Sequence, residues 1–326
     1  MFLGGRKPYT LERSDLCRVA ARYARVVTSP TTPQFVDSKL ELERVRLYVE
    51  RGEPVLLLGP TGCGKTTLLT AIAAELGRRV VPVTGGPSLT DADLLGGYLF
   101  AHDAMTWHDG PLVYAVRNGL PFFFDEIGKT SEGTLRPLYP LLDDRRELHL
   151  VGKLGREPEI VRAAPGFCFV GAYTPRELGS LPEAFLQRCR VVRLSYLAHD
   201  DEVSLLVDRA GIPRVDAEYF VDVAHVLRSG AEERRWRSPS TRALLLAARA
   251  SKSGVAREWV VRESLLDPLE LGERDTRTVL STLEAKGLSF EPGEKLPTIE
   301  ADPGDAIEPF DAVDASEPAE PEPHDG

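Results

Sequence analysis

Short apolar runs alternate with segments of helical spacing along the first two thirds of the chain. The runs Val80–Val83, Leu120–Phe124, Phe167–Ala172 and Val191–Leu194 have the length and composition of buried strands. Between them lie segments whose apolar residues recur three and four positions apart, for example Gly133–Leu142. Because strands that alternate with helices form parallel sheets covered on both faces, the pattern predicts a doubly wound α/β core.

The strand pattern ends after Tyr196, and only helical spacing follows. Four helices are expected in this part, at His199–Ala210, Asp216–Arg235, Ser240–Ala250 and Arg274–Lys286. Two more are expected before the core, at Thr10–Val27 and Ser38–Glu50. We therefore expect four parts: an N-terminal helical extension (1–37), an α/β domain (38–197), a smaller helical domain (198–288) and a disordered acidic tail (289–326).

Composition and charge exclude several classes of protein. The chain has 326 residues, of which 42% are hydrophobic and 28% charged, so a sizeable core is available. No apolar run has the length of about 18 residues that a membrane span needs, and four scattered cysteines indicate reduced, cytoplasmic thiols. The net charge is −10, and residues 300–326 contain ten acidic residues and no Lys or Arg. The remainder is therefore neutral overall, with no basic excess to indicate nucleic acid as a partner.

The loop after the predicted strand Pro54–Leu58 carries the strongest chemical signal. It reads G-x-x-x-x-G-K-T from Gly59 to Thr66 and runs into the apolar-periodic segment Thr67–Leu76. In such a phosphate-binding loop (P-loop), the glycines let backbone N–H groups surround the phosphates, the lysine approaches the β- and γ-phosphates, and the threonine hydroxyl ligates Mg²⁺. The predicted nucleotide-binding residues are Gly59, Pro60, Thr61, Gly62, Cys63, Gly64, Lys65, Thr66 and Thr67. We expect Cys63 to be a small filler residue.

Two adjacent acids end the apolar run Leu120–Phe124. Asp125 and Glu126 would lie at the carboxyl edge of a parallel sheet, where α/β proteins bind ligands. Asp125, together with Thr66, is expected to hold Mg²⁺, and Glu126 to polarise the water that attacks the γ-phosphate. A paired Asp-Glu favours hydrolysis, because a small-molecule kinase needs only the metal-binding acid.

These motifs resemble those of AAA+ ATPases: Gly59–Thr66 is similar to their P-loop, Phe122–Glu126 to their Walker B strand and Ser238–Arg242 to their second-sensor motif. The strings Leu89–Tyr98, Trp107–Leu112 and Leu141–Leu148 resemble the MoxR branch, and within it the CbbQ/NirQ/NorQ subgroup. The resemblance covers about residues 41–254. It implies a P-loop NTPase fold with a C-terminal helical lid.

The resemblance also implies a ring, usually a hexamer, with ATP bound between neighbouring subunits. Arg188 best matches the arginine that reaches the γ-phosphate bound by the next subunit, and Arg190 is the alternative candidate for this role. Arg242 resembles the second-sensor arginine, which reads the γ-phosphate in its own subunit. Thr174 stands where the family commonly has Asn, in Tyr173-Thr-Pro175, and it keeps a hydroxyl that can orient water.

Three further expectations concern surfaces and partners. Arg145 and Arg146 are expected in a solvated turn, with a surface that faces a neighbouring subunit as the alternative. Trp107 is expected either in the core or facing the ring pore or a partner. The resemblance implies a client protein or metalloenzyme, such as Rubisco or nitric oxide reductase, and a von Willebrand factor A partner. The alternatives are a small-molecule kinase, a gas-vesicle assembly ATPase, and a nucleotide-gated binding module that hydrolyses weakly.

Overall fold

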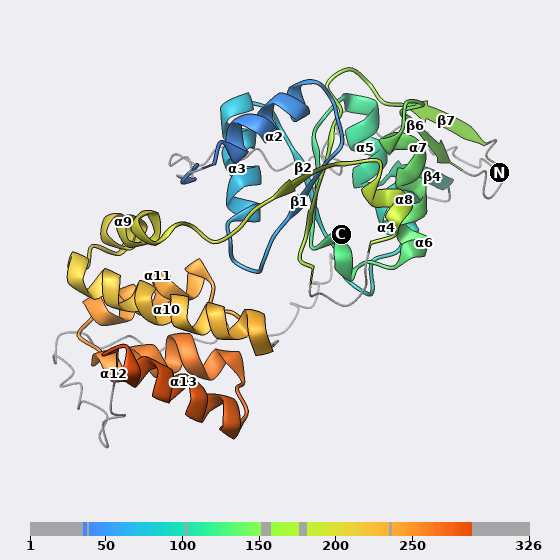
Figure 1. Cartoon of the computed structure of the whole chain (residues 1–326). Helices are drawn as coiled ribbons and strands as arrows, with labels where there is room; N and C mark the ends of the chain where they lie inside the picture. Colours follow the sequence, from blue (N-terminus) through green and yellow to red (C-terminus); the bar gives the residue numbers. More distant parts are fainter. Residues whose placement is uncertain are drawn as a thin grey trace, which may run out of the picture.

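The structure is a computed structural model that describes residues 35–37, 39–101, 104–150, 158–175, 181–234 and 237–288. Within these ranges the chain forms a domain built on a parallel sheet and a separate group of helices (Figure 1). The predicted helix Thr10–Val27 and the predicted acidic tail lie outside the described residues. The four-part division of the chain therefore remains a prediction.

Five parallel strands form the main sheet, in the order β2–β5–β8–β1–β9. Parallel strands have their carboxyl ends at one edge of the sheet, so the residues after β1, β5 and β8 meet there. The strands are β1 (Val55–Leu58), β2 (Val81–Thr84), β5 (Phe122–Asp125), β8 (Phe169–Tyr173) and β9 (Arg190–Arg193).

Helices cover both faces of this sheet, which explains why the central strands β1, β5 and β8 are almost entirely apolar. Val55 and Leu57 point to the face covered by α2 (Glu41–Glu50) and α3 (Lys65–Leu76), while Leu56 between them points to the other face. That second face packs against the other helices of the domain (Figure 1): α4 (Asp91–Leu95), α5 (Pro111–Asn118), α6 (Glu132–Leu135), α7 (Tyr139–Leu142) and α8 (Glu183–Leu186). The expected doubly wound α/β core is confirmed.

Two antiparallel hairpins extend the domain, and neither was expected from the sequence. After the short helix α4 (Asp91–Leu95), β3 (Gly96–Ala101) pairs with β4 (Ala104–Asp109). Later, β6 (Glu147–Leu150) pairs with β7 (Glu159–Arg162).

Trp107 lies in the first hairpin, half-buried against the core of the sheet domain. Its ring meets Tyr98 edge-on with the ring centroids 5.3 Å apart, and its indole Nε1 donates to Asp109 Oδ1 over 2.7 Å. Of the two expectations for this residue, the structure therefore supports packing against the core.

The helices after β9 bury a second core of their own. Leu206, Phe220, Leu227, Leu244 and Leu265 are all fully buried in it. The four helices expected here are confirmed, with ends that shift by a few residues. The elements are α9 (His199–Ala210), α10 (Arg214–Arg234), α11 (Thr241–Lys252), α12 (Arg257–Val261), the π-helical turn η3 (Arg262–Leu266), the 3₁₀ turn η4 (Asp267–Leu269) and α13 (Glu273–Ala285).

The structure corrects two expectations about the α/β domain. The predicted helical stretch Gly133–Leu142 is helical over its whole length, but it is not one α-helix: it consists of α6, the 3₁₀ turn η2 (Arg136–Leu138) and α7, because Pro137 and Pro140 lack the N–H that a continuous α-helix needs. Arg146 is half-buried: its guanidinium donates to the carbonyls of Gly52, over 2.6 Å, and Phe167, over 2.7 Å. Arg146 therefore links the segments just before β1 and β8, at the amino ends of these strands, whereas its neighbour Arg145 is exposed beside Asp143.

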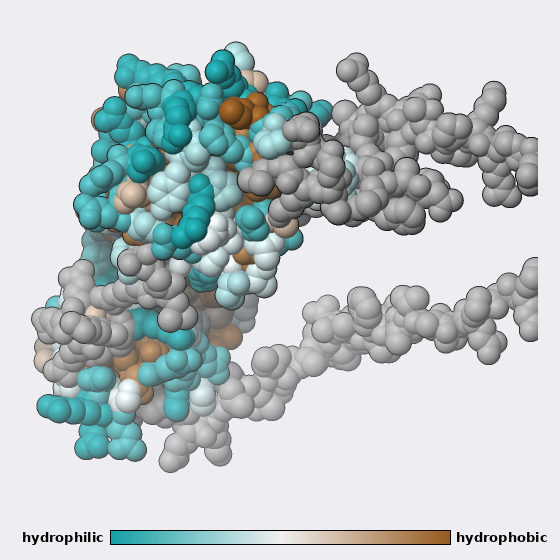
Figure 2. All heavy atoms as spheres, turned by 90° about the vertical axis from the view of Figure 1, so that its right-hand side faces the viewer, coloured by the Kyte–Doolittle hydropathy of each residue, from teal (hydrophilic) through white to brown (hydrophobic). Residues whose placement is uncertain are grey.

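Polar residues cover most of the described surface on the face shown in Figure 2, and apolar residues appear there in small groups. None of the helices that the structure describes combines the length and the apolar composition required to cross a membrane.

Candidate functional site

The P-loop joins β1 to α3 at the carboxyl edge of the sheet. Gly62 and Gly64 have φ values of +71° and +100°, the left-handed region in which residues with a Cβ are strained. A Cβ on Gly62 would also lie 2.3 Å from the Cβ of Ser240 in the helical domain. Helix α3 begins at Lys65, so its unpaired N–H groups and the positive end of its dipole face the loop. This backbone is suited to bind phosphate.

The buried side chain of Lys65 reaches across the loop to the end of β8. Its Nζ donates to the carbonyls of Gly59 and Pro60, each over 2.9 Å, and to the hydroxyl of Thr174 over 3.0 Å. All three partners are neutral oxygens. An anionic phosphate would be a stronger acceptor for the ammonium group, so these bonds can exchange for bonds to a bound nucleotide.

Thr66 and Asp125 form the oxygen pair that the sequence predicted as a metal site. The Thr66 hydroxyl donates to Asp125 Oδ2 over 2.7 Å, and Asp125 Oδ1 accepts from the backbone N–H of Glu126 over 2.9 Å. A hydroxyl and a carboxylate at this spacing are the hard oxygen donors that Mg²⁺ prefers, and both line the pocket. The residues present therefore fit a magnesium ion bound with a triphosphate.

Glu126 occupies a left-handed backbone position, with φ +51°, directly after β5. Its side chain lines the pocket and is 42% exposed. The carboxylate Oε2 lies 2.9 Å from Nζ of Lys129, three residues further on. Glu126 is thus beside the P-loop, as the sequence predicted, and it has a cationic neighbour that the sequence reading did not single out.

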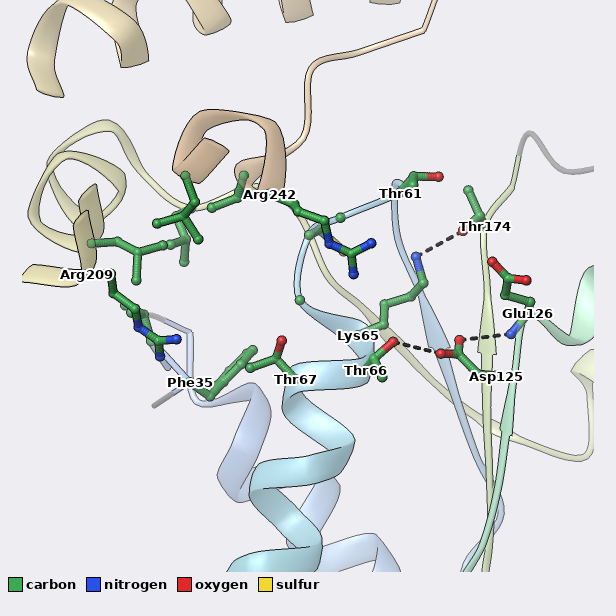
Figure 3. Close-up of a pocket in the computed structure, with 18 residues that line it drawn as sticks. Phe35, Thr61, Lys65, Thr66, Thr67, Asp125, Glu126, Thr174, Arg209 and Arg242 are labelled. Atoms are coloured by element: carbon green, nitrogen blue, oxygen red, sulfur yellow. Dashed lines mark hydrogen bonds between the residues drawn. The ribbon is translucent and has the colours of Figure 1, made fainter. Parts of the chain in front are cut away.

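The helical domain closes the other side of the pocket (Figure 3). Arg242, at the start of α11, points over the P-loop toward Lys65, and Arg209, from α9, points toward Phe35. The structure thus brings Arg242 to the predicted site. Sequence reasoning missed the remaining lining residues, because their position depends on how the two domains pack: Phe35, Val36, Leu197, Leu205, Arg209, Thr241 and Leu245.

Burial keeps the described cysteine thiols protonated. It raises the pKa of Cys63 in the P-loop, although the ammonium of Lys65 acts in the opposite direction. Burial also raises the pKa of Cys168 and that of Cys189 to about 12. Because the thiolate is the reactive form, Cys63 behaves as a small uncharged residue in the loop.

Arg188 and Arg190 lie away from the pocket of their own chain. Arg188 precedes β9 and Arg190 is its first residue, so both lie at the end of the sheet opposite to the P-loop. The Arg188 guanidinium stacks on the ring of Tyr139, 5.4 Å from its centroid. Arg190 instead pairs with Glu53 of its own chain over 2.6 Å.

Comparison with known proteins supports the resemblance to AAA+ ATPases that the sequence motifs indicated. Residues 54–189 match the family model described as the AAA domain (dynein-related subfamily), and residues 202–286 match the CbbQ/NirQ/NorQ C-terminal model. The chain is 35% identical to the denitrification regulatory protein NirQ of Pseudomonas aeruginosa over 73% of this chain and 91% of that protein. It is 33% identical to protein NorQ of Paracoccus denitrificans, over 66% and 80% of the two chains.

The chain belongs to the CbbQ/NirQ/NorQ subgroup of the MoxR family of AAA+ ATPases. This confirms the resemblance found in the sequence, and it identifies the helices after β9 as the lid of an AAA+ fold. We refer to residues 198–288 as the lid below. Family membership also indicates nucleotide binding and nucleotide-hydrolysing activity.

A more distant relative bears on one of the alternatives. The chain is 27% identical to the gas vesicle ATPase GvpN of Ancylobacter aquaticus, over 70% of each chain. The match of the lid to the CbbQ/NirQ/NorQ C-terminal model favours the NirQ and NorQ subgroup.

Proposed function

We propose that this protein hydrolyses ATP to ADP and phosphate in a magnesium-dependent reaction, and that it uses the cycle to act on a client protein. The single observation that carries the proposal is the convergence of Lys65, Thr66, Asp125, Glu126 and Arg242 on one pocket at the carboxyl edge of the sheet. Each of these side chains has the chemistry that one part of triphosphate hydrolysis requires.

The contacts in the pocket indicate the role of each group in the proposed reaction. The backbone of the P-loop and Lys65 bind the β- and γ-phosphates, and Arg242 adds a positive charge from the lid. Thr66 and Asp125 would hold Mg²⁺, which neutralises charge on the phosphate oxygens when it is bound. Glu126 accepts a hydrogen bond from the attacking water and orients it, and the hydroxyl of Thr174 helps to position that water beside Lys65.

We extend the proposal to a homo-oligomeric ring, with the hexamer of the family as its expected stoichiometry. In this ring Arg188 completes the site of the next subunit. Arg188 lies at the far end of the sheet from its own P-loop, so it can serve a nucleotide only in trans. A guanidinium supplied in this way stabilises transition-state charge and can be worth about 10³–10⁵ in rate. Sedimentation with and without ATP tests whether the ring forms.

The client belongs to the same proposal. One relative is named a denitrification regulatory protein, which supports a role in activating a partner enzyme, and we propose a metalloenzyme client engaged together with a von Willebrand factor A protein. We place this activity in the cytoplasm, where ATP is available and protonated cysteines stay reduced.

Phosphate release by the purified protein alone tests the reaction. An ATPase produces phosphate from ATP without an acceptor substrate, whereas a small-molecule kinase does not. To identify the client, tagged Glu126→Gln protein with ATP is used to capture partners, and Lys65→Ala protein serves as the matched control. A partner retained by both variants equally would argue against nucleotide-dependent client binding.

Two other functions stay open to test. The match to gas vesicle ATPase GvpN supports an assembly ATPase with the same chemistry, which differs only in its client. Thr174, which accepts a hydrogen bond from Lys65, has no amide group, whereas the family commonly has Asn at this position. This difference supports a nucleotide-gated binding module that hydrolyses ATP slowly. Steady-state turnover distinguishes the second of these from an active ATPase.

A further inference from the structure

Tyr196 connects the P-loop to the interior of the lid. It lies in the segment between β9 and α9, and its hydroxyl donates to the carbonyl of Thr61 in the P-loop over 3.2 Å. The guanidinium of Arg228, from α10, lies over its ring, with Cζ 3.9 Å from the ring centroid. The same side chain therefore makes a polar contact to one domain and a cation–π contact to the other.

Arg228 is in turn held by a buried ion pair. Its two terminal nitrogens donate to Glu202 of α9 over 2.7 and 3.1 Å, and its Nε donates to the carbonyl of Pro239 over 2.9 Å. Glu202 is fully buried and also accepts a hydrogen bond from Thr241 over 2.6 Å. Because an unpaired charge at such a site would be costly, the three groups hold one another in place.

This set of contacts, from Tyr196 through Arg228 and Glu202, ends at Thr241. Thr241 immediately precedes Arg242, and both line the nucleotide pocket. Ser240 caps α11 through its hydroxyl, which accepts a hydrogen bond from the backbone N–H of Ala243. Ser240 also packs closely on Gly62, because a Cβ on Gly62 would lie 2.3 Å from the Cβ of Ser240. The start of α11 is thus fixed to the P-loop by two routes: directly through Ser240, and through Thr241, Glu202, Arg228 and Tyr196.

We propose that Tyr196 is a positioning residue that couples the P-loop to Arg242. Its hydroxyl ties the lid network to the loop that binds the phosphates, so that Arg242 is held where a γ-phosphate would lie. This inference rests on the proposed contact of Arg242 with the γ-phosphate. It adds a specific set of contacts through which the position of Arg242 depends on the P-loop.

The consequence is a difference between ATP and ADP. ADP lacks the phosphate that Arg242 would contact, so loss of the tether should weaken ATP binding and leave ADP binding nearly unchanged. Tyr196→Phe removes only the hydroxyl and keeps the ring under Arg228. Since a single hydrogen bond contributes modestly, we expect the affinity ratio of ATP to ADP to fall about three- to tenfold.

The lid offers a closely matched control. Tyr219 also donates its hydroxyl to a backbone carbonyl, that of Leu288 over 3.4 Å, and it also carries an arginine, Arg257, 4.6 Å from its ring centroid. It does not line the pocket. Tyr219→Phe thus makes the same chemical change inside the lid and away from the pocket, and it should leave the ratio of ATP to ADP affinity at the wild-type value.

The test is a double-mutant cycle of ATP and ADP binding in the Glu126→Gln background, which prevents turnover during the measurement. Arg242→Ala should lower the ATP to ADP affinity ratio, and Tyr196→Phe should lower it no further once Arg242 is absent. Equal weakening of both nucleotides by Tyr196→Phe, or effects of the two changes that simply add, would overturn the coupling. An unchanged ratio in Arg242→Ala would overturn it as well. Phosphate release by the wild-type protein reports separately on the proposed ATPase activity.

Discussion

The ammonium nitrogen of Lys65 lies 3.0 Å from the hydroxyl oxygen of Thr174, which joins the P-loop to the end of β8. Both side chains are buried, and both line the pocket. The residue after β8 is commonly Asn in the family that the sequence resembles, so the shorter threonine changes the group that would face a bound γ-phosphate. The proposed role of Thr174 in hydrolysis is therefore the most specific question that this site poses.

Replacing Thr174 should change the rate of hydrolysis in either direction, depending on the substituent. Thr174→Val keeps the shape and removes the hydroxyl, so we expect kcat to fall about fivefold, the value of one hydrogen bond. Thr174→Asn supplies a longer side chain with an amide, and kcat should rise. Steady-state kinetics measure both. Thr282→Val, which removes a hydroxyl bonded to Thr278 on α13, is the control, and an unchanged kcat in Thr174→Val would exclude a role for this hydroxyl.

Removing the P-loop ammonium should abolish nucleotide binding. Lys65→Ala leaves the phosphates without their central positive charge, and we expect no measurable ATP binding at micromolar concentrations. Titration of a fluorescent ATP analogue gives the affinity. Lys252→Ala removes an exposed lysine from the end of α11 and should bind as the wild type does. Micromolar affinity in the Lys65→Ala protein would contradict the P-loop assignment.

The ion pair between Glu126 and Lys129 should restrain basal hydrolysis. A carboxylate paired with an ammonium group 2.9 Å away is less available to accept a hydrogen bond from water. The two side chains are 42% and 40% exposed, so the pair is weak, and its loss should raise kcat by no more than about fivefold. Lys129→Met tests this, and Lys129→Arg keeps the charge as a control.

Salt provides an independent check on the same pair. Added salt screens exposed charges, so kcat of the wild type should rise more steeply with ionic strength than kcat of Lys129→Met. A lower kcat in Lys129→Met, with the same salt dependence as the wild type, would show that Lys129 supports the active position of Glu126.

If Arg188 acts on the neighbouring subunit, two inactive variants should complement each other. Lys65→Ala subunits lack a working P-loop but keep Arg188, and Arg188→Ala subunits have the reverse defect. Mixing them should raise ATPase activity above the sum of the separate preparations. Arg190→Ala should stay active, because Arg190 is engaged by Glu53 of its own chain. The absence of any recovery, with a monomeric sedimentation profile, would contradict the shared site.

Local patterns were sufficient to predict the sheet domain and the position of the P-loop. The run Leu120–Phe124 is apolar at every position because both faces of β5 are covered, and the acids after it lie at the carboxyl edge for the same topological reason. The P-loop was recognisable because the close approach of backbone to phosphate restricts which residues fit. These features depend on the neighbouring sequence alone.

The rest depends on contacts between segments far apart in the chain. Arg146 was expected in solvent, yet it donates to carbonyls of Gly52 and Phe167, residues that no local pattern connects with it. Arg209 and Phe35 line the pocket only because the lid and the segment before α2 approach the P-loop. The two hairpins were missed because β4, β6 and β7 mix polar with apolar residues, and β3 begins with two glycines.

The measurement that tests the central claim most directly is steady-state phosphate release by the wild type and by Glu126→Gln, at the same bound fraction of ATP. Glu126→Gln keeps the size of the side chain and removes the group that accepts a proton from water. The pocket described here predicts that this variant binds ATP normally and releases phosphate at least about 10²-fold more slowly. Equal rates in the two proteins would show that Glu126 does not activate the attacking water, and the proposed mechanism would be wrong.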